Sequence, residues 1–106
     1  MAVNELARGD VVSITRGAVT QIGCVLTDSA YHAKAGVLTY CLVVPSAPTA
    51  PHTVPISYDG HTAVALPNLV QTVPVGDSDI RRLGAVDQDV VNNIVGRLLP
   101  LLGVGA

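Results

Sequence analysis

The stretch LVQTVPVGDSDIRRLGAV, from Leu69 to Val86, combines an alternating apolar ribbon with a charged cluster. Alternation with a period of two predicts a strand with one buried face, because successive side chains point to opposite sides of a sheet. Two sets should therefore face opposite ways: Val70, Thr72 and Pro74 on one side, and Leu69, Gln71, Val73 and Val75 on the other. The cluster from Asp77 to Arg82 predicts a turn that leads into a short strand.

The segment that follows has a helical period instead. From Asp87 onward, apolar residues recur along one helix face: Val90, Val91, Ile94, Val95, Leu98, Leu99 and Leu102. Asp87 suits the N-cap position, and Asp89 in the first turn complements the positive end of the helix dipole. Pro100 should kink or end the helix, and Gly103 should terminate any continuation.

The first two thirds of the chain read as short strands. Alternating runs rich in β-branched residues predict strands at 10–15, 21–28 and 37–44, and the turn Tyr58–Gly60 predicts a hairpin between the runs 53–57 and 62–67. The run Ser29–Gly36 reads as a polar connection. Four prolines between Pro45 and Pro55 remove backbone donors, so this segment predicts an extended loop or a sheet edge.

Together these elements predict the fold class. It is mainly β (α+β): a small antiparallel barrel of about five to seven strands with a C-terminal helix, formed by one domain over residues 1–106. Apolar residues make up 49% of the chain and charged residues only 13%, so polar side chains cover little of the surface and we expect a homodimer. The net charge of −2 argues against strong non-specific binding to phosphate backbones.

The cysteines and the sequence motifs limit which chemistry the protein can perform and which cellular compartment it occupies. Cys24 and Cys41 lie in apolar runs without CxxC spacing, which predicts buried free thiols in a reducing cytoplasm. No apolar run reaches membrane length, and the start shows no basic and apolar leader, so we expect a cytoplasmic protein that does not associate with membranes. No metal-ligand spacing or phosphate-cradling glycine loop is present, so neither a metal nor a cofactor is expected.

Five segments, taken in order, carry a resemblance to a known family: RGDVV (8–12), VLTDSAY (25–31), LVVP (42–45), PNLVQTVPV (67–75) and LGAVDQDVVNNIVGRL (83–98). They resemble the MazF/PemK and CcdB family of bacterial toxins from toxin–antitoxin pairs, over nearly the whole chain. The resemblance implies an SH3-like barrel that forms a homodimer. It also implies an antitoxin peptide, a host protein or RNA as partner.

The resemblance indicates where a nucleolytic site would lie. Relatives that cut RNA share an arginine–proline pair just before the second strand and a threonine or serine shortly after the third-strand proline. In this chain Gln21 takes the place of that arginine, and Ser46 follows the proline. An amide can hydrogen-bond a phosphate but cannot neutralise it. The candidate groove residues are therefore Arg16, Gln21, Ser46 and Thr49, with Arg16 placed to supply the cation from the same loop.

Arg81 and Arg82 are a second candidate feature, because they are adjacent cations in an acidic chain. One interpretation is a solvated turn in which they pair loosely with Asp77 and Asp79. The other is a basic lip that binds a partner.

Three functions are compatible with these residues. The first is a growth-inhibiting, dimeric binding module that acts on a host target, as CcdB-like relatives do, although the tryptophan–glycine–isoleucine ending of CcdB is absent here. The alternative is a divergent MazF-type endoribonuclease that cuts single-stranded RNA without a metal, with His52 and His61 as further acid–base candidates. The third is a bacterial or phage barrel that binds a host protein or an antitoxin-like peptide at a sheet edge. Whether the chain is an enzyme stays open at this point.

Overall fold

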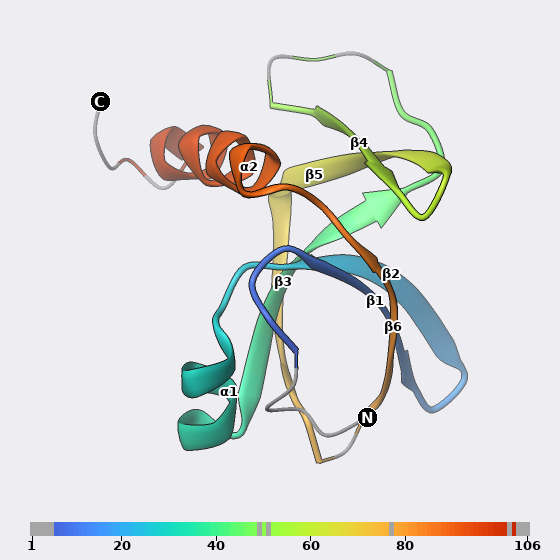
Figure 1. Ribbon diagram of the computed structural model, residues 1–106, viewed down its shortest axis with the longest axis vertical. Helices are drawn as coiled ribbons and strands as arrows, with labels where there is room; N and C mark the ends of the chain where they lie inside the picture. Colours follow the sequence, from blue (N-terminus) through green and yellow to red (C-terminus); the bar gives the residue numbers. More distant parts are fainter. Residues whose placement is uncertain (1–5, 49, 51, 77, 102, 104–106) are drawn as a thin grey trace.

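A computed structural model describes residues 6–48, 50, 52–76, 78–101 and 103 of the chain. Within this part lie six strands and two helices: β1 (Asp10–Arg16), β2 (Val19–Val25), α1 (Ser29–Ala35), β3 (Val37–Val44), β4 (Val54–Tyr58), β5 (His61–Pro74), β6 (Asp79–Ala85) and α2 (Gln88–Leu101). The strands form one antiparallel sheet in the order β4-β5-β3-β2-β1-β6. The sheet curls into a half-barrel with α1 and α2 at opposite ends, as Figure 1 shows. The predicted fold class is confirmed.

The curled sheet buries apolar side chains on both of its faces. One cluster gathers residues from β1, β2, β3 and β5, together with Leu6 from the segment before β1: Leu6, Val12, Ile14, Val25, Leu38, Tyr40 and Val73. The other cluster lies under β4 and α2: Val11, Cys24, Cys41, Val43, Val54, Ile56, Tyr58, Ala63, Ala65 and Ile94. Neighbouring residues such as Val11 and Val12 enter different clusters because alternate side chains leave a strand on opposite sides.

β5 corrects the prediction of two separate strands on either side of Pro67. It runs unbroken from His61 to Pro74, and its register on β3 shifts between Cys41, which faces Val70, and Leu42, which faces Leu66. The extra residues on β5 form an irregularity where a proline is tolerated, because the ladder there needs no donor. The predicted alternation is confirmed only near the end of the strand, where Val73 is buried. Leu69, from the same set, is 43% exposed.

Residues 29–36 correct a second prediction, because a helix stands where a polar connection was expected. Asp28 caps α1, and its Oδ1 accepts a hydrogen bond from the Tyr31 amide at 2.8 Å. Gly36 ends the helix in the left-handed conformation with φ 71°, and its N–H donates to the carbonyl of His32. Both capping signals are present in the sequence.

The C-terminal helix follows its predicted stripe in part. Val91 and Ile94 are buried, and Val90 packs against the same cluster. Leu99 and Leu101 are exposed by 39% and 51%, so the apolar face extends beyond the sheet. α2 ends at Leu101, one residue after Pro100. Leu102 lies outside the described residues.

Pro45, Pro55 and the two cysteines lie as predicted. β3 ends at Val44, immediately before Pro45, and Pro55 lies in β4 at the edge of the sheet. Cys24 and Cys41 are buried free thiols that face each other across β2 and β3. A hydrogen bond from the Cys24 thiol to the Cys41 sulfur raises the pKa of Cys24 and lowers the pKa of Cys41. Neither of the two described helices is both long and apolar enough to cross a membrane.

Candidate functional site

A polar pocket opens on the face of the sheet where β1 and β2 approach β5. Its volume is about 250 Å³, and its walls come from four strands: Ile14, Arg16, Val19, Gln21, Tyr40, Gln71 and Val73. The register brings these residues to one face, because Ile14 pairs with Gln21 and Tyr40 pairs with Gln71. Arg16 and Gln21, predicted as groove residues, therefore line the same pocket.

Tyr40 occupies the pocket floor because Gly23 leaves room for its ring. A Cβ added to Gly23 would lie 2.2 Å from Cδ2 of Tyr40 and 2.7 Å from Cγ, closer than any side chain tolerates. The ring therefore packs flat against the backbone of β2, and Tyr40 is only 1% exposed. The sequence alone does not predict this contact, because nothing near Gly23 in the chain indicates that a tyrosine ring lies against it.

The hydroxyl of Tyr40 lies between two glutamines. Its oxygen lies 2.8 Å from Oε1 of Gln21 and 2.9 Å from Oε1 of Gln71, both within hydrogen-bonding distance. Burial raises the pKa of Tyr40, and the positive charge of Arg16 opposes this shift. The hydroxyl therefore keeps its proton at neutral pH. Tyr40 and Gln71 were not predicted as site residues, because only the β3–β5 register brings them to Gln21.

The described structure does not bring Ser46, a third predicted groove residue, into this pocket. Ser46 is exposed, lies two residues beyond the end of β3, and is not among the lining residues. Thr49 lies outside the described residues. The ring of His61 lies tilted beside that of Tyr58, with centroids 5.8 Å apart, and His52 lines a different pocket beside α2. Neither histidine lines the polar pocket.

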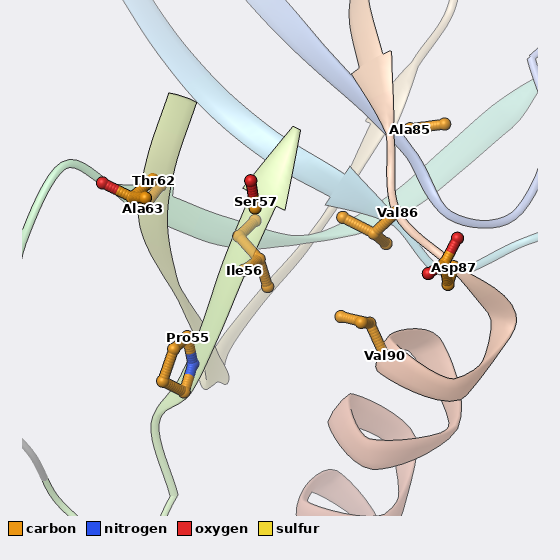
Figure 2. Close-up of a pocket in the computed structure, with 9 residues that line it drawn as sticks. All are labelled: Pro55, Ile56, Ser57, Thr62, Ala63, Ala85, Val86, Asp87 and Val90. Carbon is orange, nitrogen blue, oxygen red and sulfur yellow. The ribbon is translucent and has the colours of Figure 1, made fainter. Parts of the chain in front are cut away.

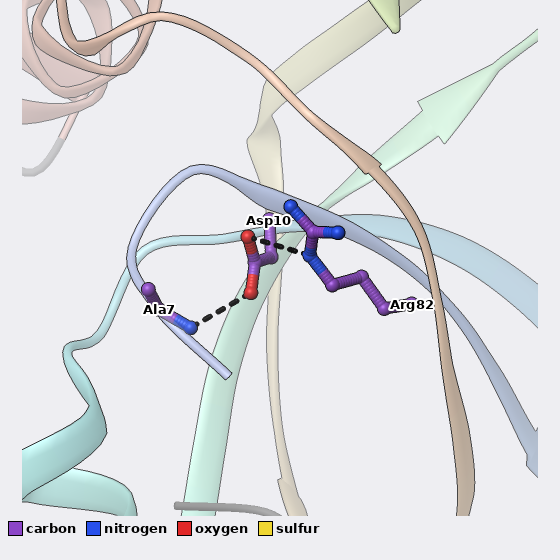
Figure 3. Close-up of polar contacts among 3 residues, drawn as sticks. All are labelled: Ala7, Asp10 and Arg82. Carbon is purple, nitrogen blue, oxygen red and sulfur yellow. Dashed lines mark hydrogen bonds and ion pairs between the residues drawn. The ribbon is translucent and has the colours of Figure 1, made fainter. Parts of the chain in front are cut away.

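Arg81 and Arg82 lie within β6 and not in the turn that was predicted for them. Arg82 contacts Asp10 on the neighbouring strand β1, although the two residues are 72 positions apart in the sequence: Nε of Arg82 donates to Oδ1 at 3.2 Å. The other carboxylate oxygen of Asp10 accepts the amide of Ala7 at 2.8 Å, and Figure 3 shows both contacts. Among the residues that the structure describes, Arg81 pairs with Asp79, at 3.5 Å and in solvent. Arg82 thus holds the start of β1.

Because the Asp10 side chain is 8% exposed, losing its cation should destabilise the fold. We expect Arg82→Ala to lower the free energy of unfolding by about 1–3 kcal/mol, since a buried carboxylate is left without its partner. The matched change Arg81→Ala should cost no more than about 0.5 kcal/mol, because exposed ion pairs contribute little. Urea unfolding of the two variants measures the difference. Equal losses would contradict the structural role of Arg82.

A larger cavity, of about 420 Å³, lies between the β4–β5 hairpin and the start of α2. Figure 2 shows Ile56, Val86 and Val90 turned toward it. Asp87 is the one titratable residue in its lining, so the cavity lacks the set of groups that acid–base chemistry requires. Within the described part of the chain, no group of three or more His, Cys, Asp or Glu side chains could hold a metal ion.

Comparison with known proteins adds to this geometry. No family model matches the chain, and no curated protein matches its sequence. Among solved structures, a MazE–MazF complex from Deinococcus radiodurans superposes with a TM-score of 0.85 and 23% identity, over 94% of this chain and 97% of the other. The chain has the fold of the MazF toxins.

Two mycobacterial structures extend the likeness to the MazF fold. An endoribonuclease in complex with its cognate antitoxin gives a TM-score of 0.81 at 18% identity, over 95% of this chain and 98% of that chain. An endoribonuclease alone gives 0.79 at 19% identity, over 100% and 97%. The MazF fold is thus kept at full length, although fewer than one residue in four is identical.

Proposed function

We propose that this chain is the toxin of a toxin–antitoxin pair and acts as an endoribonuclease on single-stranded RNA. The MazF fold supports the first part, because solved structures of that fold include a toxin, an endoribonuclease and an endoribonuclease in complex with its cognate antitoxin. The observation that carries the second part is the position of Arg16, which lines one pocket together with Gln21.

Arg16 would act on the phosphate that is cleaved. Negative charge develops on the phosphate oxygens as the bond breaks, and a guanidinium fixed beside them stabilises that charge. Gln21 alone would donate a hydrogen bond without adding charge. Arg16 ends β1 and Val19, its register partner, begins β2, so the cation stands at the mouth of the pocket where an extended strand of RNA can reach it. That Ser46 or Thr49 positions the phosphate with its hydroxyl stays a prediction.

Exposed side chains on the surface indicate which partners the protein would bind. Val19, Leu69, Val70 and Leu99 are all between 37% and 60% exposed. Apolar side chains in such number favour a protein interface, so we propose a homodimer and an antitoxin that covers part of this surface. Arg81, whose side chain is 75% exposed, is the better of the two candidate partner-binding arginines, because Arg82 is engaged with Asp10.

The second candidate is a binding module that inhibits a host protein without cutting RNA. The sequence expectation in its favour is Gln21, a neutral amide where the resemblance to nucleolytic relatives implies an arginine. If it were correct, induction of the protein would stop growth while cellular RNA stayed intact.

One assay separates the two functions. Purified protein is incubated with a mixture of single-stranded RNAs in EDTA, and the products are sequenced. We expect cleavage at defined sites without added metal, and growth arrest with loss of RNA when the protein is expressed. Intact RNA at micromolar protein would overturn the nuclease proposal.

A further inference from the structure

The Tyr40 hydroxyl cannot donate a hydrogen bond to both of the glutamines that flank it. A tyrosine hydroxyl has one proton, so it can donate to the oxygen of one amide only. Yet its oxygen lies 2.8 Å from Gln21 and 2.9 Å from Gln71, and both distances are those of hydrogen bonds. The second amide must therefore turn its nitrogen toward Tyr40 and donate to the hydroxyl oxygen, because amide oxygen and nitrogen exchange places by rotation about the last side-chain bond.

These hydrogen bonds determine which amide groups the pocket presents to a ligand. The amide that gives its oxygen to Tyr40 shows its NH₂ group to the pocket, and the amide that gives its nitrogen shows its carbonyl oxygen. Whichever glutamine takes which part, the two side chains offer one donor and one acceptor side by side. Gln71 is exposed and Gln21 is half-buried, whereas Tyr40 is covered, so the amides and not the hydroxyl meet a ligand.

The surroundings suit a flat heterocycle. Ile14, Val19 and Val73 supply apolar walls, and the cavity of about 250 Å³ has room for one nucleobase. Every nucleobase carries hydrogen-bonding groups on an exposed edge, with donor and acceptor adjacent in adenine, cytosine, guanine and uracil. Proteins that recognise single-stranded RNA by sequence read such edges on unstacked bases. Arg16 at the mouth of the same pocket would hold the neighbouring phosphate.

We propose that Gln21 and Gln71, held by the hydroxyl of Tyr40, read the edge of one base of the bound RNA. This inference rests on the proposed function, since it assigns base selectivity to the pocket that would bind the RNA. Tyr40 is a positioning residue, because it acts through the two amides. Gln21 and Gln71 are the residues that touch the base.

Binding can be tested apart from cleavage. The probes are short RNAs with 2′-O-methyl riboses, which lack the nucleophile for cleavage, abasic except for one central A, C, G or U. Affinities are measured by fluorescence anisotropy for the wild type and for Tyr40→Phe, which keeps the ring on Gly23 but removes the hydroxyl. We expect the wild type to bind its preferred base at least about tenfold more tightly than the least preferred. Tyr40→Phe should reduce this ratio to about threefold or less.

Gln71→Glu tests the donor–acceptor argument itself. A carboxylate only accepts hydrogen bonds, so the pocket loses its donor and the preference should move toward a base that presents an amino group. Gln88→Glu, which makes the same change on the exposed surface of α2, is the matched control and should keep the wild-type order of bases. Thermal unfolding shows that each variant is folded.

The outcomes are separable from those of the cleavage assay. A base preference that Tyr40→Phe weakens supports the inference whether or not the unmodified RNA is cut. Equal affinity of the wild type for all four probes, no detectable binding, or a preference that survives Tyr40→Phe and Gln71→Glu overturns it, even if RNA is cleaved.

Discussion

Replacing Arg16 with glutamine is expected to slow RNA cleavage by about 10²–10³-fold, the usual cost of losing one group that stabilises charge in a transition state. The change keeps a polar side chain that can donate a hydrogen bond, although a shorter one, and it removes the positive charge. Arg16 is exposed at the end of β1, so the fold should lose less than about 0.5 kcal/mol. The measurement is the single-turnover rate on a defined RNA in EDTA, compared with the wild type.

Two further variants show whether charge is the cause. Arg97→Gln removes a cation from α2, outside the lining of the polar pocket, and should cut RNA at the wild-type rate. Arg16→Lys keeps the charge without the planar fork that matches a phosphate, so its rate should fall between those of the wild type and Arg16→Gln. A wild-type rate for Arg16→Gln would show that another group supplies the charge.

The largest expected effect on stability belongs to Gly23→Ala. The added methyl group would lie 2.2 Å from a ring atom of Tyr40, and β2 cannot retreat because it is paired with β1 on one side and β3 on the other. Overpacking alone costs about 1–3 kcal/mol, and expulsion of the ring from the core would approach the cost of about 3–5 kcal/mol seen when a large aromatic side chain is deleted. We expect a loss of at least about 3 kcal/mol in urea unfolding, or failure to fold.

The steric origin of this loss can be isolated. Gly96→Ala, on the exposed face of α2, meets nothing within 4 Å and should raise helix stability by as much as about 1 kcal/mol. In a double-mutant cycle, Gly23→Ala should cost much less in a Tyr40→Leu background, because the ring it displaces is gone. Additive costs in that cycle would rule out the contact with Tyr40 as the cause.

Local patterns in the sequence determined most of the elements. The run from Val37 to Val44 was predicted with its observed bounds, because β-branched residues and a following proline define a strand without reference to the rest of the chain. The stripe after Asp87 likewise predicted α2. α1 was missed although Asp28 and Gly36 cap it, because seven residues carry too short an apolar period to outweigh their polar composition.

Which residues meet at the site became clear only from the tertiary structure. The sequence pointed to Arg16 and Gln21, which lie close together on one hairpin, but Gln71 reaches Tyr40 from 31 residues away and Arg82 reaches Asp10 from 72. Such contacts depend on strand order and register, and a shift of one residue would turn each side chain to the other face. Periodicity shows which residues one strand buries. Which side chains meet across the sheet is set by pairing between distant strands, and no local pattern records it.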